Sequence, residues 1–141
     1  MNNDTRGFPG YIASRAVFGN RVPQHIQNLV IREHSKKYGL AYRLSGTEYA
    51  MDHCYMMLQQ LVDELPAHRG IIAYSMFMLP QRAERRRAIY DQVLAADCEL
   101  HGAVEDIVLA GPADIRRWED IWQVQQATMS TDAAEIADGL R

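Results

Sequence analysis

Short apolar runs alternate with helix-like segments along the whole chain, and this alternation limits the possible folds more than any other feature. The runs at 11–14, 40–45, 70–75 and 99–104 have the length and composition of buried strands. In the segments between them, apolar residues recur at spacings of three and four, as in amphipathic helices. Parallel neighbouring strands need such crossover helices, so the pattern predicts a mostly parallel sheet.

Capping residues place the helices between these strands. Pro23 suits the first turn of a helix over 23–38, because a proline lacks the N–H that would have no partner there, and Gly39 can end that helix. The arginines at 85–87 point in three directions around a later helix, and we expect all of them to face solvent. The remaining helices are predicted at about 53–65, 82–96 and 114–129.

The elements together predict a three-layer α/β domain. Its mostly parallel sheet should have four or five strands, with helices on both faces. We expect a single domain over residues 1–129 that is ordered from about residue 10, followed by a polar C-terminal tail at 130–141. A hydrophobic fraction of 48% and a charged fraction of 23% are ordinary for a globular protein of this length.

Composition also argues against several classes of partner. The net charge of -3 gives no general attraction to nucleic acid or to an anionic membrane surface. Cys54 and Cys98 match neither a disulfide framework nor a zinc motif, and the five histidines lack metal-ligand spacing, so we expect no metal and no cofactor. The apolar stretch at 71–80 is too short to span a membrane, and no signal peptide is visible, so the expected location is cytoplasmic.

The loop after the first predicted strand carries the richest polar chemistry. Ser14 and Arg15 follow that strand, and Arg21, Gln24 and His25 lead into the first helix. Ligands of open α/β sheets bind at the carboxyl ends of strands, and a helix amino end contributes free N–H groups. The loop is therefore a candidate anion site. The alternative is a solvated loop whose arginines pair with surface carboxylates.

Three side chains near this edge are candidates for catalysis. Ser14 is a candidate nucleophile, His53 a candidate general acid or base, and Glu48 a carboxylate partner. Each also has a simpler interpretation, because serines often end strands and loop histidines and glutamates often face water. The side chains predicted to surround a substrate are Tyr11, Arg15, Arg21, Gln24, His25, Ser45, Tyr55, Ser75 and Glu105.

The last predicted helix carries a prominent apolar stripe. Trp118 and Trp122 lie four residues apart on one helical face, and Ile115 and Ile121 extend that face. The stripe either packs on the protein's own sheet or forms an interface between two copies. We expect a homodimer through the helix that carries Trp118 and Trp122.

The order of these motifs resembles the catalytic domain of serine recombinases, the resolvases and invertases. The likeness covers about residues 10–122 and rests on a Gly-Tyr-x-x-Ser string, an apolar strand that ends in Ser75, and the segment from Gly102 to Glu105. It implies a resolvase-like fold, an active edge at the strand ends and dimerisation through a late helix. The segment 76–81 lacks the family's aspartate and arginine, and no basic arm follows, so DNA cleavage does not carry over.

Three longer strings resemble the small bacterial "sporadic carbohydrate cluster" proteins. They lie at 19–25 (GNRVPQH), 47–51 (TEYAM) and 53–57 (HCYMM). The resemblance implies a role beside genes for surface polysaccharides or sugar-containing metabolites. The leading expectation is an enzyme acting on a small anionic substrate, a sugar phosphate or nucleotide sugar, by isomerisation, elimination or hydrolysis. The alternative is a non-catalytic binding or scaffold module.

Overall fold

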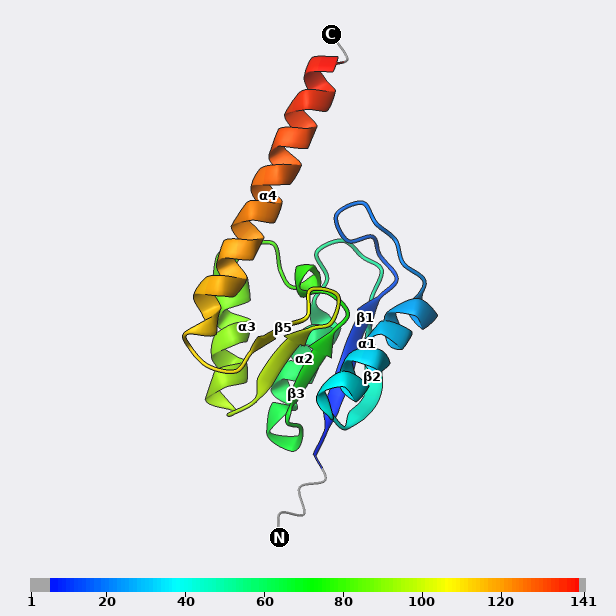
Figure 1. The fold of residues 1–141 in the computed structure, drawn as a ribbon, viewed down its shortest axis with the longest axis vertical. Helices are drawn as coiled ribbons and strands as arrows, with labels where there is room; N and C mark the ends of the chain where they lie inside the picture. The colour runs from blue at the N-terminus through cyan, green and yellow to red at the C-terminus, as the bar shows by residue number, and fades with distance from the viewer. Residues whose placement is uncertain (1–5, 140–141) are drawn as a thin grey trace.

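The computed structural model of the protein describes residues 6–139, and within them lies a five-stranded sheet with helices on both faces (Figure 1). The strand order is β2-β1-β3-β4-β5. The first four strands of this order run parallel to one another, and β5 runs antiparallel to β4. The strands are β1 (Phe8–Ala13), β2 (Tyr42–Glu48), β3 (Gly70–Ala73), β4 (Glu99–Gly102) and β5 (Ile107–Leu109). The predicted three-layer α/β architecture is confirmed.

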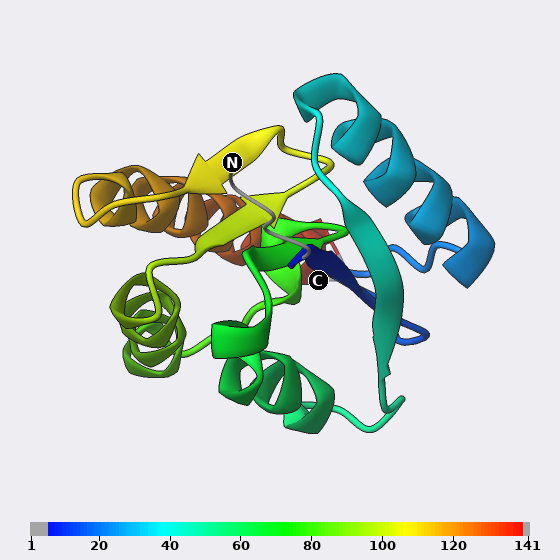
Figure 2. The same ribbon diagram turned by 90° about the horizontal axis from the view of Figure 1, so that it is seen from below.

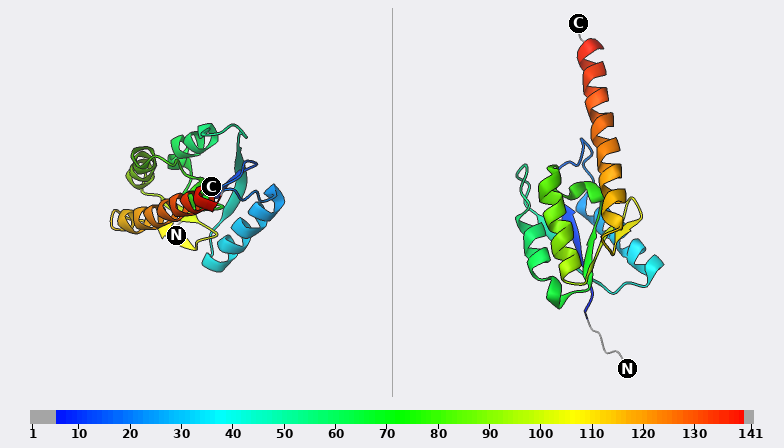
Figure 3. Two further views of the ribbon diagram at one scale, coloured as in Figure 1. Left: turned by 90° about the horizontal axis from the view of Figure 1, so that it is seen from above. Right: turned by 90° about the vertical axis from the view of Figure 1, so that its left-hand side faces the viewer.

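The helices divide unequally between the two faces of the sheet. One face is covered by α1 (Gln24–Tyr38), whereas α2 (Met56–Asp63), α3 (Ala83–Ala95) and α4 (Asp114–Gly139) lie on the other face (Figures 2 and 3). Short 3-10 turns, η1 (Leu65–Ala67) and η2 (Met76–Met78), precede and follow β3. The predicted ends of the first helix are close to the observed ones. Pro23 is its N-cap, and Gly39 ends it with a left-handed φ of 65°.

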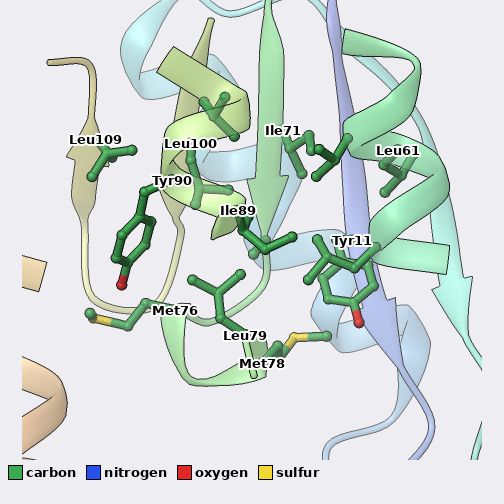
Figure 4. Packing of buried hydrophobic residues seen from close by; sticks show 14 of the residues in the cluster. Tyr11, Leu61, Ile71, Met76, Met78, Leu79, Ile89, Tyr90, Leu100 and Leu109 are labelled. Atoms are coloured by element: carbon green, nitrogen blue, oxygen red, sulfur yellow. The ribbon is translucent and has the colours of Figure 1, made fainter. Parts of the chain in front are cut away.

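The larger core lies between the sheet and the three-helix face. Side chains from β1, β3, β4 and β5 meet side chains from α2 and α3 there (Figure 4). Trp118 and Trp122 of α4 are fully buried in the same core. The expectation that this tryptophan face is free to bind a second copy is therefore wrong. The apolar stripe of α4 covers apolar surface that β5 and α3 would otherwise expose to water.

Two strands extend beyond their predicted limits. β1 begins at Phe8, before the predicted start, and it ends at Ala13, which leaves Ser14 outside the strand. β2 runs on to Glu48, whose Cα is paired with that of Ala13, so Ser45 lies inside the strand and not at its end. Central β1 has strand partners on both sides, so backbone pairing continues through residues whose side chains alone suggest a loop.

Arg86 is buried, which corrects the prediction that all three arginines of α3 face solvent. Its guanidinium donates to both carboxylate oxygens of Glu119 in α4, with Nε–Oε2 at 2.9 Å and Nη2–Oε1 at 2.8 Å. It also donates to the carbonyl oxygens of Pro80 and Gln81 and lies 4.1 Å from the centre of the Trp122 ring. The partner carboxylate is on another helix, so no pattern within α3 marks this arginine.

The last helix is longer than its predicted part. It continues through Gly139, into the segment that the sequence suggests is a polar tail, and projects away from the sheet (Figure 1). Val124 is 67% exposed on it. Across residues 6–139, no helix combines the length and the apolar character that crossing a membrane would require.

Candidate functional site

A cavity of about 260 Å³ opens at the carboxyl ends of β1, β3 and β4, and α4 borders it. It brings together three of the predicted substrate-binding residues, Arg15, Ser75 and Glu105. The other lining side chains are aromatic, aliphatic or amide groups: Val17, Phe18, Asn20, Val22, Gln27, Tyr74, Phe77, Val104 and Gln125. This is the edge at which open α/β sheets bind ligands.

Glu105 is held in place by two donors from the neighbouring strand end. Its Oε2 accepts a hydrogen bond from Ser75 Oγ at 2.7 Å, and its Oε1 accepts one from the Met76 N–H at 2.7 Å. Ser75 Oγ in turn accepts a hydrogen bond from the Phe77 N–H at 3.1 Å. The turn between β4 and β5 and the start of η2 are thereby joined at the cavity wall. The result is a positioned carboxylate that can accept a hydrogen bond or a proton from a ligand.

The first loop owes its shape to a tight turn that packs on the core. The backbone groups of Val17 and Asn20 exchange hydrogen bonds of 2.9 and 3.0 Å, and the two residues between them have positive φ. Glycine adopts the φ of 79° at Gly19 without steric cost. The Phe18 ring packs edge-on against Phe77 and Trp122, with ring centres 5.3 and 5.8 Å away. This packing fixes the loop that carries Arg15.

Gln27 also lines the cavity and holds two backbone segments of its wall in place. Its side-chain amide pairs with both backbone groups of Ala13, at 3.1 Å for Oε1 and 2.6 Å for Nε2, and it also donates to the Val22 carbonyl at 2.8 Å. The amide thus continues the backbone pairing at the carboxyl end of β1 as a strand would, and it ties α1 to that end. Gln27 is 3% exposed, and we assign it a structural role.

Arg15 lines the cavity and also stacks on an aromatic ring. Its Nη1 donates to the carbonyl oxygens of Met51 and Cys54, and its guanidinium carbon lies 4.8 Å from the centre of the Tyr55 ring. The guanidinium carbon of Arg85 lies 5.1 Å from the same ring. Tyr55 therefore places two positive charges close together, although the two arginines are far apart in the sequence.

A second hollow of about 380 Å³ lies between α2 and α3 and includes Tyr55, Arg85 and the exposed His53. None of the described residues that line this hollow is an aspartate or a glutamate. Arg15 lines the first cavity and stacks on Tyr55, which lines this hollow, so the two spaces adjoin at that stack. Positive charge is concentrated where they meet.

Glu48 serves the fold, and the hydrogen bonds of its carboxylate go to groups other than His53, its predicted partner. It is 1% exposed. Its carboxylate accepts hydrogen bonds from the Met57 and Leu58 N–H groups at 3.0 and 3.1 Å and from the Tyr11 hydroxyl at 2.8 Å. Burial acts to raise the pKa of Glu48, but these hydrogen bonds outweigh it and hold that pKa below its ordinary value. Glu48 thereby caps α2, whose N-cap residue Tyr55 provides no side-chain bond.

Tyr11 and Ser45 are engaged within the fold as well. The Tyr11 side chain is fully buried, and its pKa is raised by burial and by the neighbouring Glu48 carboxylate. Ser45 Oγ donates to Asn28 Oδ1 at 2.7 Å and shares a 2.8 Å hydrogen bond with the Tyr42 hydroxyl, so it joins β2 to α1. Neither side chain lines the cavity.

The remaining predicted residues do not converge. Arg21, Gln24 and His25 are exposed, and the cavity wall includes none of them. Ser14 is half-buried just after β1 but does not line the cavity, and His53 lines the second hollow. The proposed serine, histidine and glutamate are thus not assembled into one catalytic group. In the described part of the chain, no cluster of histidine, cysteine, aspartate and glutamate is suited to hold a metal ion.

Several lining residues are not identified by the motifs of the sequence. Phe18 and Asn20 lie within the loop singled out from the sequence, so their position was a usable signal. Arg85 lies in a run of arginines whose members look alike until the helices pack. Gln125 lies on α4, and it reaches the cavity because Trp118 and Trp122 dock that helix on the core. No local pattern identifies it.

Comparison with known proteins shows the fold and nothing finer. No family model matches the sequence, and no curated protein matches it. The fold is similar to that of the crystal structure of a resolvase family site-specific recombinase from Streptococcus pneumoniae, with a TM-score of 0.59 over 95% of this chain and 99% of that chain. The sequence identity is 6%. The predicted resolvase-like fold is confirmed, whereas no family match supports the resemblance to sporadic carbohydrate cluster proteins.

Proposed function

We propose that this protein is an enzyme of carbohydrate or specialised-metabolite biosynthesis that binds a small anionic sugar derivative in the cavity at the carboxyl edge of its sheet. The substrate is a sugar phosphate or a nucleotide sugar, and the partner is thus a small metabolite. The observation that carries the proposal is the presence of Arg15 and Glu105 on the walls of one cavity. A guanidinium can pair with a phosphate, and a positioned carboxylate can accept from a sugar hydroxyl.

The rest of the cavity wall suits the same ligand class. Phe18, Tyr74 and Phe77 offer aromatic surface to the apolar faces of a sugar ring, and Asn20 and Gln125 offer amides to its hydroxyl groups. Small-molecule sites commonly combine apolar walls with a few placed polar groups. The second hollow, with Arg85 beside Tyr55, gives room for a further phosphate or for the nucleoside of a nucleotide sugar.

Glu105 is the residue we assign to proton transfer. Its carboxylate lines the cavity and is held by Ser75 and Met76, whereas Glu48 is committed to capping α2. Isomerisation, elimination and hydrolysis of a sugar derivative all need such a group. The proposal therefore moves the role of general acid or base from the predicted His53, with Glu48 as its carboxylate partner, to Glu105.

A non-catalytic binding module is the second candidate. The observation that favours it is the separation of Ser14, His53 and Glu48, because Glu105 is then the one carboxylate, with no histidine, among the described residues that line the cavity. Turnover separates the two candidates. Glu105→Gln keeps an oxygen acceptor for the Met76 N–H, so the cavity wall and the binding of a substrate should be preserved. The amide cannot take up a proton, so turnover should be abolished if the protein is an enzyme.

The binding proposal predicts different effects for two arginines of the same loop. Arg15→Ala should weaken binding of UDP-glucose about tenfold to a hundredfold, the loss expected from ~1.5–3 kcal/mol of charge-assisted hydrogen bonding. Arg21→Ala removes the same charge from an exposed position off the cavity wall, so it should leave the affinity within about twofold. Isothermal titration calorimetry measures both affinities, and far-UV circular dichroism checks that each variant is folded.

Two further results would contradict the proposal that the ligand binds in this cavity. Equal weakening by both arginine variants would indicate general attraction of anions to a positive surface. Unchanged binding after Gln125→Glu, which puts a negative charge on the cavity wall, would place the ligand elsewhere. Gln123→Glu is the matched control for that variant, because Gln123 is exposed on the same helix and does not line the cavity.

A further inference from the structure

A chain of ionisable side chains crosses the opposite face of the sheet, beside α1. His34 of α1 and His101 of β4 are 7% and 6% exposed, and His34 Nε2 lies 2.9 Å from His101 Nδ1. His101 Nε2 lies 3.0 Å from Glu99 Oε1, and His34 Nδ1 lies 3.9 Å from Asp106 Oδ1. These side chains line a hollow of about 320 Å³. None of these side chains lines the candidate substrate cavity.

The acceptor at one end of the chain determines where the protons lie. Glu99 is an acceptor when ionised, so His101 Nε2 carries a hydrogen and donates it. The neutral ring of His101 then has its lone pair on Nδ1, which accepts from the Nε2–H of His34. His34 Nδ1 is left with a lone pair directed to the side on which Asp106 lies. Two acceptors therefore face each other across 3.9 Å without a hydrogen between them.

We propose that His34 Nδ1 and Asp106 form a proton-binding site, and that proton uptake there moves the turn that carries Glu105. A proton taken from solvent bonds to His34 Nδ1 and turns the acceptor pair into an imidazolium–carboxylate pair. A charge-assisted hydrogen bond of this kind is about 2.7–2.9 Å long, so Asp106 must approach His34 by roughly 1 Å to form it. The bond from His34 Nε2 to His101 is retained, because it needs no further proton.

The turn between β4 and β5 connects this site to the substrate cavity. Asp106 has a φ of 53° and follows Glu105 directly, and its N–H donates to the Ala103 carbonyl at 3.2 Å. Glu105 holds Ser75 Oγ and the Met76 N–H at the cavity wall. A tight turn transmits displacement of one residue to the next, so the Glu105 carboxylate moves when Asp106 moves. The effect on substrate affinity rests on the proposed function, whereas the proton site and its coupling to Glu105 do not.

Several neighbouring charges influence the pH at which His34 takes up its proton. From α1, Lys37 Nζ pairs with Asp106 Oδ2 at 2.9 Å, the Tyr38 hydroxyl donates to Asp106 Oδ1, and Glu33 borders an adjoining hollow with His34. From β4, His101 and Glu99 complete the surroundings. Burial is the main cause that lowers the pKa of His34, and His101 and Lys37 add to it, whereas Asp106 acts in the opposite direction. Proton uptake therefore occurs below the ordinary histidine value of 6.5.

NMR of the full-length protein tests the site without any ligand. Nitrogen-15 spectra of the imidazole rings at about pH 8 should show His34 protonated on Nε2 and bare on Nδ1. As the pH falls below the ordinary histidine value of 6.5, His34 Nδ1 should gain its proton, and the amide signals of Met76 and Phe77 should shift along the same titration curve. A proton on His34 Nδ1 at about pH 8 would overturn the proposal, as would a His34 titration that leaves the Met76 amide unmoved.

A matched pair of variants isolates the histidine. His34→Gln keeps a donor toward His101 but cannot bind a proton, so the titration of the Met76 amide should disappear. His25→Gln lies at the exposed end of the same helix, and the titration should persist in it. Asp106→Asn should also remove the titration of the Met76 amide, because no carboxylate remains to be drawn inward. If His34→Gln and the native protein titrate alike at Met76, the proton acts elsewhere. The imidazole spectra of the native protein decide the question if a variant fails to fold.

Discussion

Glu48 shows how a residue with the chemistry of an active site can serve the fold instead. Its carboxylate lies next to a histidine-containing loop and near the end of β2, yet its oxygen atoms are occupied by the Met57 and Leu58 N–H groups and by the Tyr11 hydroxyl. A helix amino end presents N–H groups that need acceptors, and α2 lacks a capping side chain of its own. Glu48 meets that need from another element.

Replacing this carboxylate should destabilise the protein. Glu48→Gln leaves an amide hydrogen facing a backbone N–H in a buried place, so we expect a loss of about 2–4 kcal/mol in the free energy of unfolding. Urea denaturation measures it. Glu33→Gln is the control, because Glu33 is exposed on α1, and its change should stay within about 0.5 kcal/mol. A loss as small as that of the control would show that Glu48 does not cap α2.

The same carboxylate gives the native protein an acid dependence. The folded-state pKa of Glu48 lies below its ordinary value of 4.5, so its contribution to stability is present above about pH 4.5 and is lost as the pH falls through the folded-state pKa. Glu48→Gln cannot titrate. The difference in unfolding free energy between native protein and variant should therefore shrink on acidification. Denaturation curves at several pH values check this, and a constant difference would contradict it.

At the scale of elements, the contact between α3 and α4 includes a buried ion pair. Arg86 and Glu119 are 2% and 6% exposed, and Tyr90 also donates to Glu119 at 2.8 Å. Removing one member of such a pair leaves a buried charge without its partner, which costs far more than the pair itself contributes. Together with Trp118 and Trp122 the pair holds α4 on the core, and α4 carries Gln125 to the substrate cavity.

Arg86→Met should therefore lower the free energy of unfolding by about 3–5 kcal/mol. Chemical denaturation measures it, and Arg87→Met is the control, since Arg87 is exposed one position further along α3. Replacing Arg86 and Glu119 together by methionine should recover part of the loss, because neither charge is then left alone. A double variant as unstable as the sum of the single variants would contradict this account.

At the scale of the whole molecule, the projecting part of α4 is the feature that packing around the sheet leaves unexplained. The helix continues beyond the core through Gly139 (Figure 3). Val124 and Met129 are exposed on it. We propose that two copies associate through this part of the helix. The proposal keeps the predicted homodimer but moves its interface away from Trp118 and Trp122, which the core occupies.

Light scattering at micromolar concentration should therefore give the mass of a dimer. Val124→Glu places a charge at the most exposed apolar side chain described on the projecting helix, so it should shift the mass to that of a monomer without changing the far-UV circular dichroism spectrum. Gln123→Glu is the matched control, and the dimer should persist in it. A monomeric mass for the native protein would remove this proposal.

The α/β architecture and the rough position of each element could be predicted from the sequence alone. Alternating apolar runs and helical periods are local patterns, because a strand or a helix must turn one side toward a core wherever that core lies. Pro23 and Gly39 mark helix ends for an equally local reason, the geometry of their own backbone. The edge at which Arg15, Ser75 and Glu105 gather followed from the common direction of parallel strands.

The tertiary structure decided which of these residues are available for function. Whether Glu48 faces a ligand or a helix end, whether Arg86 faces water or Glu119, and whether the tryptophan stripe meets a partner or the sheet all depend on residues remote in sequence. The pairing of His34 with His101 is of the same kind. The position of a side chain in the repeating pattern of the sequence determines the side of the helix or strand on which it lies. Its charge state and accessibility are set by the groups that folding brings against it, and those groups come from other elements.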